Sequence, residues 1–364
     1  MKRIILLLFL LLIISGCSEK EEPSFVQPDT EPESSIEKQK EEPPFEMLKV
    51  NPSTFHFIAD WLSDTELLYV EKNGGLYQVK SFNIETGEIK QIYEDSSFIT
   101  DVYVHPSLNY LLIHTSEQSD SAIIKVISTD GSLQHQVEIE STELSIEWNE
   151  LDPEKILFTA FHEDWSYDLF VFDGHTENLS IIELEDPFPK WSGENGIAYM
   201  LFPDHPLEGG DMQIYNLGTG SSVSFVGKDV IYFDTFKDTL FIVQALQPDL
   251  FMYSIRNDKG TILSSWDMPA VSNYSEWVIP DVEWTNEGQI LYKGARQTGQ
   301  LDEIGSNFNL YRHEAESSEL IMEGLEAEPF KCSPSGNRCL NGYTFDELIE
   351  VDSGEKRKWI QLNE

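Results

Sequence analysis

Residues 284–292 read WTNEGQILY and residues 332–340 read CSPSGNRCL, and these two stretches share one pattern. Each starts with a bulky residue, continues through a short polar turn and ends in an apolar run that is typical of a β-strand. The same pattern occurs seven times along the chain, starting at Trp61, Val104, Trp148, Trp191, Phe233, Trp284 and Cys332. Successive starts are 43, 44, 43, 42, 51 and 48 residues apart, which indicates one structural unit copied along the sequence.

Two further strand-like runs follow each start. In the first repeat they are residues 76–83 and 88–93, separated by the turn Glu85-Thr86-Gly87. Four short strands in 40 to 50 residues are typical of a β-propeller blade. We therefore predict an all-β fold, a single β-propeller of four-stranded antiparallel blades over residues 51–364, with seven repeats counted and six blades also open.

Two structural expectations accompany this fold. The first segment, Thr54 to Ala59, could pair with the last blade and so close the ring. The four starting tryptophans could form a carbohydrate-stacking ring, but a large aromatic at an equivalent position of each repeat usually fills the wedge between neighbouring blades. We therefore expect Trp61, Trp148, Trp191 and Trp284 to lie in the core.

The turn Ser333-Pro334-Ser335-Gly336-Asn337 resembles the SPDG-type repeat of TolB-like propellers. From Cys17 to the C-terminus the chain is similar to the YqgU-like lipoproteins of Gram-positive bacteria, a propeller family of unassigned function. That resemblance implies six blades, whereas the repeat count predicts seven.

The N-terminus reads as an export signal. Lys2 and Arg3 precede an apolar run from Ile4 to Ile14, which is too short to span a bilayer as a helix and has the length of a signal-peptide core. The sequence Ile14-Ser15-Gly16-Cys17 resembles the bacterial lipobox, which implies cleavage after residue 16 and a lipid (palmitate) on Cys17. We expect a lipoprotein held at the outer face of the cytoplasmic membrane.

Residues 17–50 form the next predicted segment, a lipidated tether rich in acidic residues and proline, with little to bury and therefore disordered. The whole chain has 24 Lys and Arg against 65 Asp and Glu, a formal net charge of −41. Such a chain repels phosphate backbones, so we expect no nucleic-acid partner and no membrane contact other than the lipid. The charge suits a basic partner, or it serves only solubility. We expect a monomer.

The sequence lacks the common catalytic signatures. It contains no Gly-x-Ser-x-Gly elbow, His-Glu-x-x-His helix, phosphate-binding loop, dinucleotide fingerprint or Asp-x-Asp calcium loop. We name no catalytic residue and lean towards a protein that is not an enzyme. Cys332 and Cys339 flank one turn on two adjacent strands, and they form either a disulfide or two buried thiols; both roles are structural.

Two sets of loop residues are the candidate sites. His162 and His205 both follow their starting tryptophan by fourteen residues, so loops with His162, Asp164, Asp204 and His205 could converge on one face. Imidazole and carboxylate groups are suitable ligands for a divalent cation, the one cofactor considered, although solvated loop residues explain them equally. The long loop 294–306, with Arg296 and Asp302, is a candidate recognition element.

Three functions follow, in order of preference. The first is a non-enzymatic binding platform at the cell surface for an extracytoplasmic protein or a cell-wall polymer. The second is a metal-dependent hydrolase, using calcium or zinc, with its site on the top face of the propeller. The third is a small-ligand sensor for a membrane partner. The fold alone does not decide among them.

Overall fold

The computed structural model describes residues 45–363 except 204, 206 and 280. The described residues belong to the second of the two units into which the chain divides, Pro43–Glu364. The predicted signal peptide, Cys17 and most of the predicted tether lie outside the described residues. No helix in the described part of the chain is long and apolar enough to span a membrane.

Nearly all of the second unit is β-sheet. Five antiparallel sheets have four strands each and one has seven. The first three sheets are β2(Phe55–Trp61), β3(Glu66–Asn73), β4(Leu76–Asn83) and β5(Ile89–Asp95); β6(Phe98–Val104), β7(Tyr110–Gln118), β8(Ser121–Ser128) and β9(Leu133–Glu140); and β10(Glu143–Trp148), β11(Lys155–Phe161), β12(Tyr167–Asp173) and β13(Asn178–Ile182).

The seven-stranded sheet comes next along the chain. It contains β14(Lys190–Ser192), β15(Gly196–Leu201), β16(Gly210–Asn216), β17(Ser221–Phe236), β18(Thr239–Gln247), β19(Leu250–Asn257) and β20(Ile262–Pro269). The last two four-stranded sheets are β23(Val282–Trp284), β24(Ile290–Ala295), β26(Phe308–Glu314) and β27(Ser317–Leu325); and β28(Phe330–Cys332), β29(Arg338–Asn341), β30(Glu347–Glu350) and β31(Glu355–Lys358).

Smaller elements complete the fold. β1(Leu48–Val50) pairs in parallel with β32(Ile360–Leu362). A three-stranded sheet is formed by β21(Val271–Asn273), β22(Glu276–Trp277) and β25(Gly299–Gln300), beside the four-residue helix α1(Leu301–Ile304).

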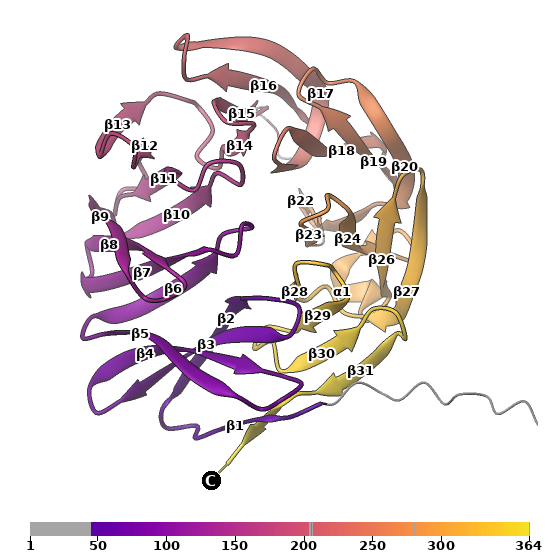
Figure 1. The fold of residues 1–364 in the computed structure, drawn as a ribbon. Coiled ribbons are helices and arrows are strands. Elements are labelled where there is room, and N and C mark those ends of the chain that lie inside the picture. Colours follow the sequence, from indigo (N-terminus) through magenta and orange to yellow (C-terminus); the bar gives the residue numbers. More distant parts are fainter. Residues whose placement is uncertain (1–44, 204, 206, 280, 364) are drawn as a thin grey trace, which may run out of the picture. The chain divides into compact units, whose positions relative to one another are not determined.

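The sheets follow one another in chain order around a ring (Figure 1). Their first strands are in contact with one another, as β2 is with β6, β10 with β14 and β23 with β28. Apolar side chains fill the space between successive sheets; Val70 of the first sheet and Leu111 of the second, for example, are fully buried in one cluster. This arrangement is a β-propeller, as the repeat pattern predicted.

Strand β17 makes one region of the ring different. Its first half pairs with β16 and its second half with β18, with register shifts on both sides. The fourth and fifth sequence repeats therefore lie in one continuous sheet. In the part of the chain described, six sheets have four or more strands, against the seven repeats counted in the sequence.

Ring closure differs from the expectation. Thr54 to Ala59 does not pair with the last sheet, because β2 forms a hairpin with β3 of its own repeat. The ends of the chain are joined instead by β1 and β32, so residues 48–50, predicted to lie in the tether, form a strand with Leu48 fully buried. Trp61 Nε1 also donates a hydrogen bond to the Lys331 carbonyl of the last sheet, at 3.0 Å.

The starting tryptophans take part in packing, as expected. Trp61 and Trp191 are buried, and Trp148 and Trp284 are partly buried and pack against hydrophobic clusters formed by adjoining strands. The fifth repeat needs a correction. In the other repeats the starting residue lies opposite the first apolar residue of the next strand, as Trp284 lies opposite Ile290. In the fifth repeat the residue opposite the first apolar residue, Leu240, is Thr235. The equivalent starting position is therefore Thr235 and not Phe233.

Candidate interaction surface

The antiparallel strands place their connections at two edges of the ring. One edge, here called the turn face, carries the connections between first and second strands and between third and fourth strands. Its residues are 62–65, 84–88, 105–109, 129–132, 149–154, 174–177, 193–195, 217–220, 237–238, 258–261, 285–289, 315–316, 333–337 and 351–354.

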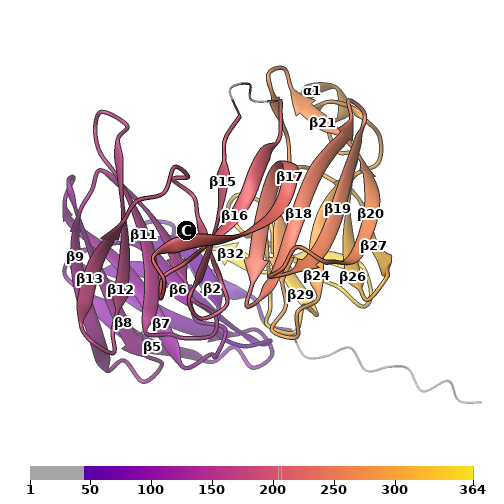
Figure 2. The same ribbon diagram turned by 90° about the horizontal axis from the view of Figure 1, so that it is seen from above.

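The other edge, the loop face, carries the connections between second and third strands and those that lead into the next sheet. Its described residues are 74–75, 96–97, 119–120, 141–142, 162–166, 183–189, 202–203, 205, 207–209, 248–249, 270–279, 281, 296–307, 326–329 and 342–346. Figure 2 shows this edge uppermost, with β21 and α1 on it.

Side chains close the turns of the turn face. Asn149 is fully buried, and its Oδ1 accepts hydrogen bonds from the N–H groups of Leu151 and Asp152 at 2.9 and 3.0 Å. Asn83 and Asn257 accept two backbone N–H bonds each in the same way. Asparagine suits these turns because its short side chain bonds to the backbone two to four residues further on.

The turns also bond to one another from sheet to sheet. His105 Nε2 lies 2.9 Å from the Asn149 carbonyl oxygen, and Asn149 Nδ2 donates to the Gly193 carbonyl at 3.0 Å. Asn286 N–H donates to the Pro334 carbonyl at 2.8 Å, and its Nδ2 donates to the Pro106 carbonyl at 2.8 Å. Because Asn286 and Pro106 belong to sheets that are not neighbours, the turns meet across the ring.

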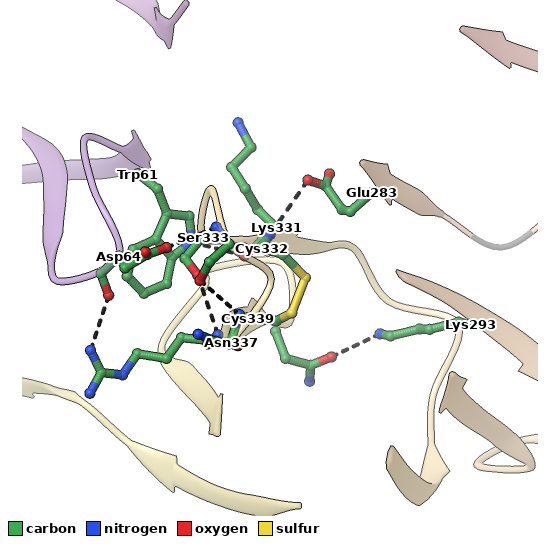
Figure 3. The surroundings of a disulfide bond; sticks show 12 residues. Trp61, Asp64, Glu283, Lys293, Lys331, Cys332, Ser333, Asn337 and Cys339 are labelled. Carbon is green, nitrogen blue, oxygen red and sulfur yellow. Dashed lines mark hydrogen bonds between the residues drawn. A yellow bond between two sulfur atoms is a disulfide. The ribbon is translucent and has the colours of Figure 1, made fainter. Parts of the chain in front are cut away.

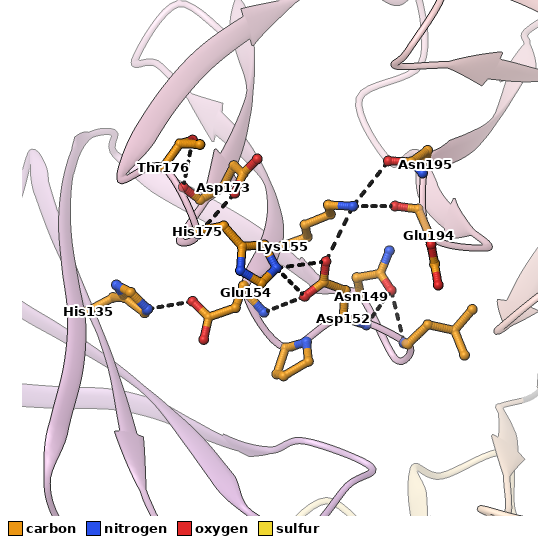
Figure 4. A network of polar contacts seen from close by, with 12 residues as sticks. His135, Asn149, Asp152, Glu154, Lys155, Asp173, His175, Thr176, Glu194 and Asn195 are labelled. Atoms are coloured by element: carbon orange, nitrogen blue, oxygen red, sulfur yellow. Dashed lines mark hydrogen bonds and ion pairs between the residues drawn. The ribbon is translucent and has the colours of Figure 1, made fainter.

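Charged pairs strengthen the same face (Figure 4). Lys155 lies 3.3 Å from Asp152 and donates to the Glu194 carbonyl of the next sheet at 3.0 Å, while His175 Nε2 lies 3.2 Å from Asp152. Burial works against ionisation of Asp152, but hydrogen bonds from Glu154 N–H, Lys155 and His175 outweigh it and lower its pKa. These contacts join strands and sheets, so the turn face is structural.

The two cysteines flank one of these turns. Cys332 and Cys339 face each other on β28 and β29 and form a disulfide, with Cα atoms 3.9 Å apart (Figure 3). Both are buried. The disulfide closes the turn 333–337, whose Ser335 N–H donates to Asp64 Oδ1 of the first sheet at 2.8 Å.

A belt of charges joins the first strands. Lys190 lies 2.8 Å from Glu147 of the preceding sheet and 3.2 Å from Asp234. Lys331 lies 3.6 Å from Asp60 of the first sheet. Each lysine thus lies beside carboxylates from neighbouring repeats, and this belt contributes to ring closure. Burial raises the pKa of Glu283, which lies near Lys331, to about 8.

The loop face carries exposed aromatic side chains. Trp165 is 81% exposed, and Tyr274 and Tyr343 are each 75% exposed. The other exposed aromatic residues among those described are Phe98, Phe188 and Phe202; five of the six lie in the loop-face connections, and Phe98 is the first residue of β6, directly after the connection 96–97. The turn-face segments contain no Phe, Trp or Tyr in their sequence. Isolated exposed apolar residues are ordinary, but exposed aromatics gathered at one edge make that edge the candidate interaction surface.

The predicted recognition loop lies on the loop face. It pairs with the connection before β23, because β25 lies parallel to β21. Arg296 lies 3.8 Å from Glu323, and Asp302 Oδ2 accepts a hydrogen bond from the Tyr274 hydroxyl at 2.9 Å. Trp277 Nε1 donates to the Leu207 carbonyl at 3.1 Å, which fixes this small sheet to the loop of the preceding sheet.

The predicted metal ligands are placed as follows. His162 Nε2 lies 3.0 Å from Asp168 Oδ2, and Asp164 Oδ1 accepts hydrogen bonds from Ser166. His205 Nδ1 accepts a hydrogen bond from Leu207 N–H at 3.2 Å, and Asp204 lies outside the described residues. Within the described residues no three His, Cys, Asp or Glu side chains gather as a metal site. The divalent-cation site stays a prediction.

A cavity of about 380 Å³ opens on the loop face between the last two sheets. Its lining includes Glu326, Glu328, Tyr343 and Asp346. Beneath it the buried Lys293 donates to the carbonyl of Glu328 and to Asn341 Oδ1, and burial lowers its pKa to about 8. Sequence reasoning did not find this cavity or the exposed aromatics, although aromatic residues within polar connecting segments, such as Tyr343, were a visible signal.

Comparisons with known proteins agree with this architecture. The family model described as "YqgU-like 6-bladed beta propeller domain" matches residues 83–342. The chain is 23% identical over 360 residues to the "Uncharacterized lipoprotein YqgU" of Bacillus subtilis (strain 168), covering 98% of this chain and 96% of that protein.

Two solved structures have the same fold. The uncharacterized protein lmo1340 from Listeria monocytogenes EGD-e gives a TM-score of 0.79 at 18% identity, covering 87% of this chain and 98% of that one. The β-propeller domain of the Trilobed protease from Pyrococcus furiosus gives 0.56 at 15% identity, covering 85% and 99%. At these identities the two structures show the fold alone.

Proposed function

The chain belongs to the family of YqgU-like six-bladed β-propeller domains, and from that premise we propose that it is a lipid-anchored extracytoplasmic binding platform and not an enzyme. In this proposal, Cys17 carries the lipid and holds the protein at the outer face of the cytoplasmic membrane. The loop face contacts an extracytoplasmic partner, and the turn face keeps the ring together.

The anchor is supported by the sequence before the propeller and by the relative. Ile14-Ser15-Gly16-Cys17 follows an apolar run of signal-peptide length. The Bacillus subtilis relative, which matches along nearly its whole length, is named a lipoprotein. A lipid on Cys17 would tether the propeller through residues 18–44.

The confinement of the exposed aromatics to one edge carries the binding proposal. Exposed aromatic side chains offer large apolar area with few rotatable bonds, which makes them frequent anchors in interfaces. Five of the six described ones lie in the loop-face connections, and the sixth, Phe98, directly follows one of them at the start of β6.

We also propose that the ring is built from seven equivalent four-stranded units, two of which share the long strand β17. In every repeat, the turn between the first and second strands forms a hydrogen bond with the corresponding turn of another repeat. His105, Asn149, Asn286 and Ser335 take part in these bonds. The family description as six-bladed corresponds to the six sheets, since one of them holds two repeats.

Site-specific photo-crosslinking in intact cells tests the platform. A photo-reactive phenylalanine derivative is placed in the full chain at Trp165, Tyr274 or Tyr343, and for comparison at the exposed turn-face residue Leu151. We expect crosslinked products from the loop-face positions and none from Leu151. Products of equal yield from both faces, or none from the loop face, would contradict the proposal.

A further inference from the structure

Two of the three most exposed aromatics of the loop face are held in an unfavourable backbone conformation. Trp165 has φ 65° and Tyr274 has φ 55°, in the left-handed region that bulky residues rarely adopt. That region costs a non-glycine residue roughly 1–2 kcal/mol. Because both side chains are mostly exposed, packing within this chain does not offset the cost. Leu108 and Lys237 on the turn face adopt the same region, so Trp165 and Tyr274 are set apart by the exposure of their aromatic side chains and not by the backbone alone.

The surroundings of both tips are acidic. Glu163 and Asp164 directly precede Trp165 and are exposed. Around Tyr274 lie the exposed Glu276 and Asp302, and the Tyr274 hydroxyl is bonded to Asp302. Apart from histidines, Arg296 is the one basic residue in the sequence of the loop-face connections, and it lies 3.8 Å from Glu323.

The cavity between the last two sheets is lined by four carboxylates, Glu326, Glu328, Asp346 and Glu347, and by one lysine, Lys356, which lies 3.0 Å from Glu347. Neither Glu326 nor Glu328 has an ion pair within the described residues, although both line it. The ammonium group of Lys293 donates hydrogen bonds to the backbone carbonyls of Glu326 and Glu328 and to Asn341 Oδ1, and not to the two glutamate carboxylates. At about 380 Å³ the cavity is within the size range of ligand pockets, and the 75% exposed Tyr343 also lines it.

We infer that the loop face binds a protein segment that bears lysine and arginine side chains, and this inference rests on the proposed function. An ammonium or guanidinium group is attracted both to an aromatic ring face and to a nearby carboxylate. Trp165 and Tyr274 offer ring faces beside carboxylates, and the cavity lined by Tyr343, Glu326 and Glu328 can receive one long cationic side chain. Charge complementarity therefore selects a basic partner.

Binding of a defined cationic peptide tests the inference. The probe is fluorescein-labelled decalysine, and the protein is the full chain in detergent micelles at about 150 mM salt, where surface charges are partly screened. Glu303 is an exposed residue of α1, next to Asp302. We expect saturable binding that weakens at least about tenfold in Trp165→Asn and in the double variant Glu163→Lys with Glu303→Lys.

The matched control makes the same charge change on the turn face. Glu287 and Glu316 are exposed there, without a hydrogen bond or ion pair from their side chains in the described structure. We expect Glu287→Lys with Glu316→Lys to change the affinity less than about twofold. Equal weakening by both double variants would show general attraction to an acidic protein and would overturn the inference, as would the absence of saturable binding.

The crosslinking experiment separates this inference from the platform itself. A basic protein partner is supported if decalysine and salt both suppress the loop-face crosslinks and if protease degrades the crosslinked product. Loop-face crosslinks that neither agent suppresses leave the platform standing and overturn the inference. Crosslinked material degraded by a cell-wall hydrolase, and not by protease, assigns the face to a wall polymer and also overturns it.

Discussion

The turn face and the loop face are built from the same antiparallel strands, yet they use their residues differently. On the turn face, Asn149 satisfies two N–H groups of its own turn and reaches the next sheet through its side-chain amide. On the loop face, Trp165 and Tyr274 project outward from strained positions and are mostly exposed. Both faces are acidic, so net charge does not distinguish them; the placement of amides and aromatics does.

This contrast separates residues that the fold needs for its own stability from residues that are free to contact another molecule. Where a polar side chain closes a turn and also joins two sheets, it is occupied by the fold. Where a large apolar side chain lies exposed on a strained loop tip, the fold gains little from it. Stability and binding should therefore respond to substitutions on opposite faces, and the predictions below measure that separation.

The largest effect on stability is expected on the turn face. Asn149→Ala removes the acceptor of two backbone N–H bonds and the donor to Gly193, leaving buried groups unpaired. We expect the free energy of unfolding to fall by about 3 kcal/mol. Urea unfolding followed by tryptophan fluorescence measures it, with Asn178→Ala on the exposed start of β13 as a control that should change it by less than about 0.5 kcal/mol.

The disulfide of the turn face should come next. Cys332→Ala with Cys339→Ala removes a crosslink between residues seven positions apart. The loss of this short loop is expected to cost about 2 kcal/mol. The same urea titration measures it, and crosslinking from the loop face should keep its yield at temperatures where the variant is folded. A wild-type midpoint in the double variant would show that this crosslink does not stabilise the turn face.

Much of the fold was predictable because its signals are local. Hairpin pairs such as β3 and β4 follow from apolar runs separated by turn residues within one repeat. The pairing of β1 with β32 was not predictable, because two three-residue strands at opposite ends of the chain carry no local signal. The continuity of β17 was also missed, since the register shifts that shape it depend on pairing with β16 and β18.

The candidate site was less accessible to sequence reasoning. The segments containing His162, His205 and Arg296 were correctly placed in loops, but local partners such as Asp168 and Glu323 were not foreseen, because those contacts depend on strand register and on pairing between sheets. Exposure is likewise a property of the folded ring. Aromatic residues such as Trp165 and Trp277 look alike in sequence, although only the second is packed and hydrogen-bonded.

A smaller, pH-dependent effect is expected at one corner of the loop face. Burial works against ionisation of Asp95, but hydrogen bonds from Lys125, Ser97 N–H and Tyr93 outweigh it and hold its pKa at about 2. Because the folded-state pKa is below the unfolded value, this stabilisation is present above about pH 4 and is lost as the pH falls towards 2. Asp95→Asn should lower stability by about 1 kcal/mol at neutral pH and reduce the acid dependence over that range.

The smallest effect on stability is expected from Trp165→Asn. Asparagine tolerates the left-handed conformation at φ 65° better than tryptophan, and no packing is lost from this exposed side chain. The free energy of unfolding should therefore stay within about 0.5 kcal/mol of the original value or rise. Differential scanning calorimetry measures it, and a clear decrease would mean that Trp165 stabilises the loop.

One measurement tests the separation of the two faces most directly. A photo-crosslinker is placed at Phe202 on the loop face of the full chain, and Trp165, Tyr274 and Tyr343 are all replaced by Asn. The account predicts at least a tenfold loss of crosslinked product on intact cells, with a urea midpoint equal to that of the chain carrying the crosslinker alone. An unchanged yield, or a yield that falls only together with the midpoint, would contradict the claim that the loop face is the interaction surface.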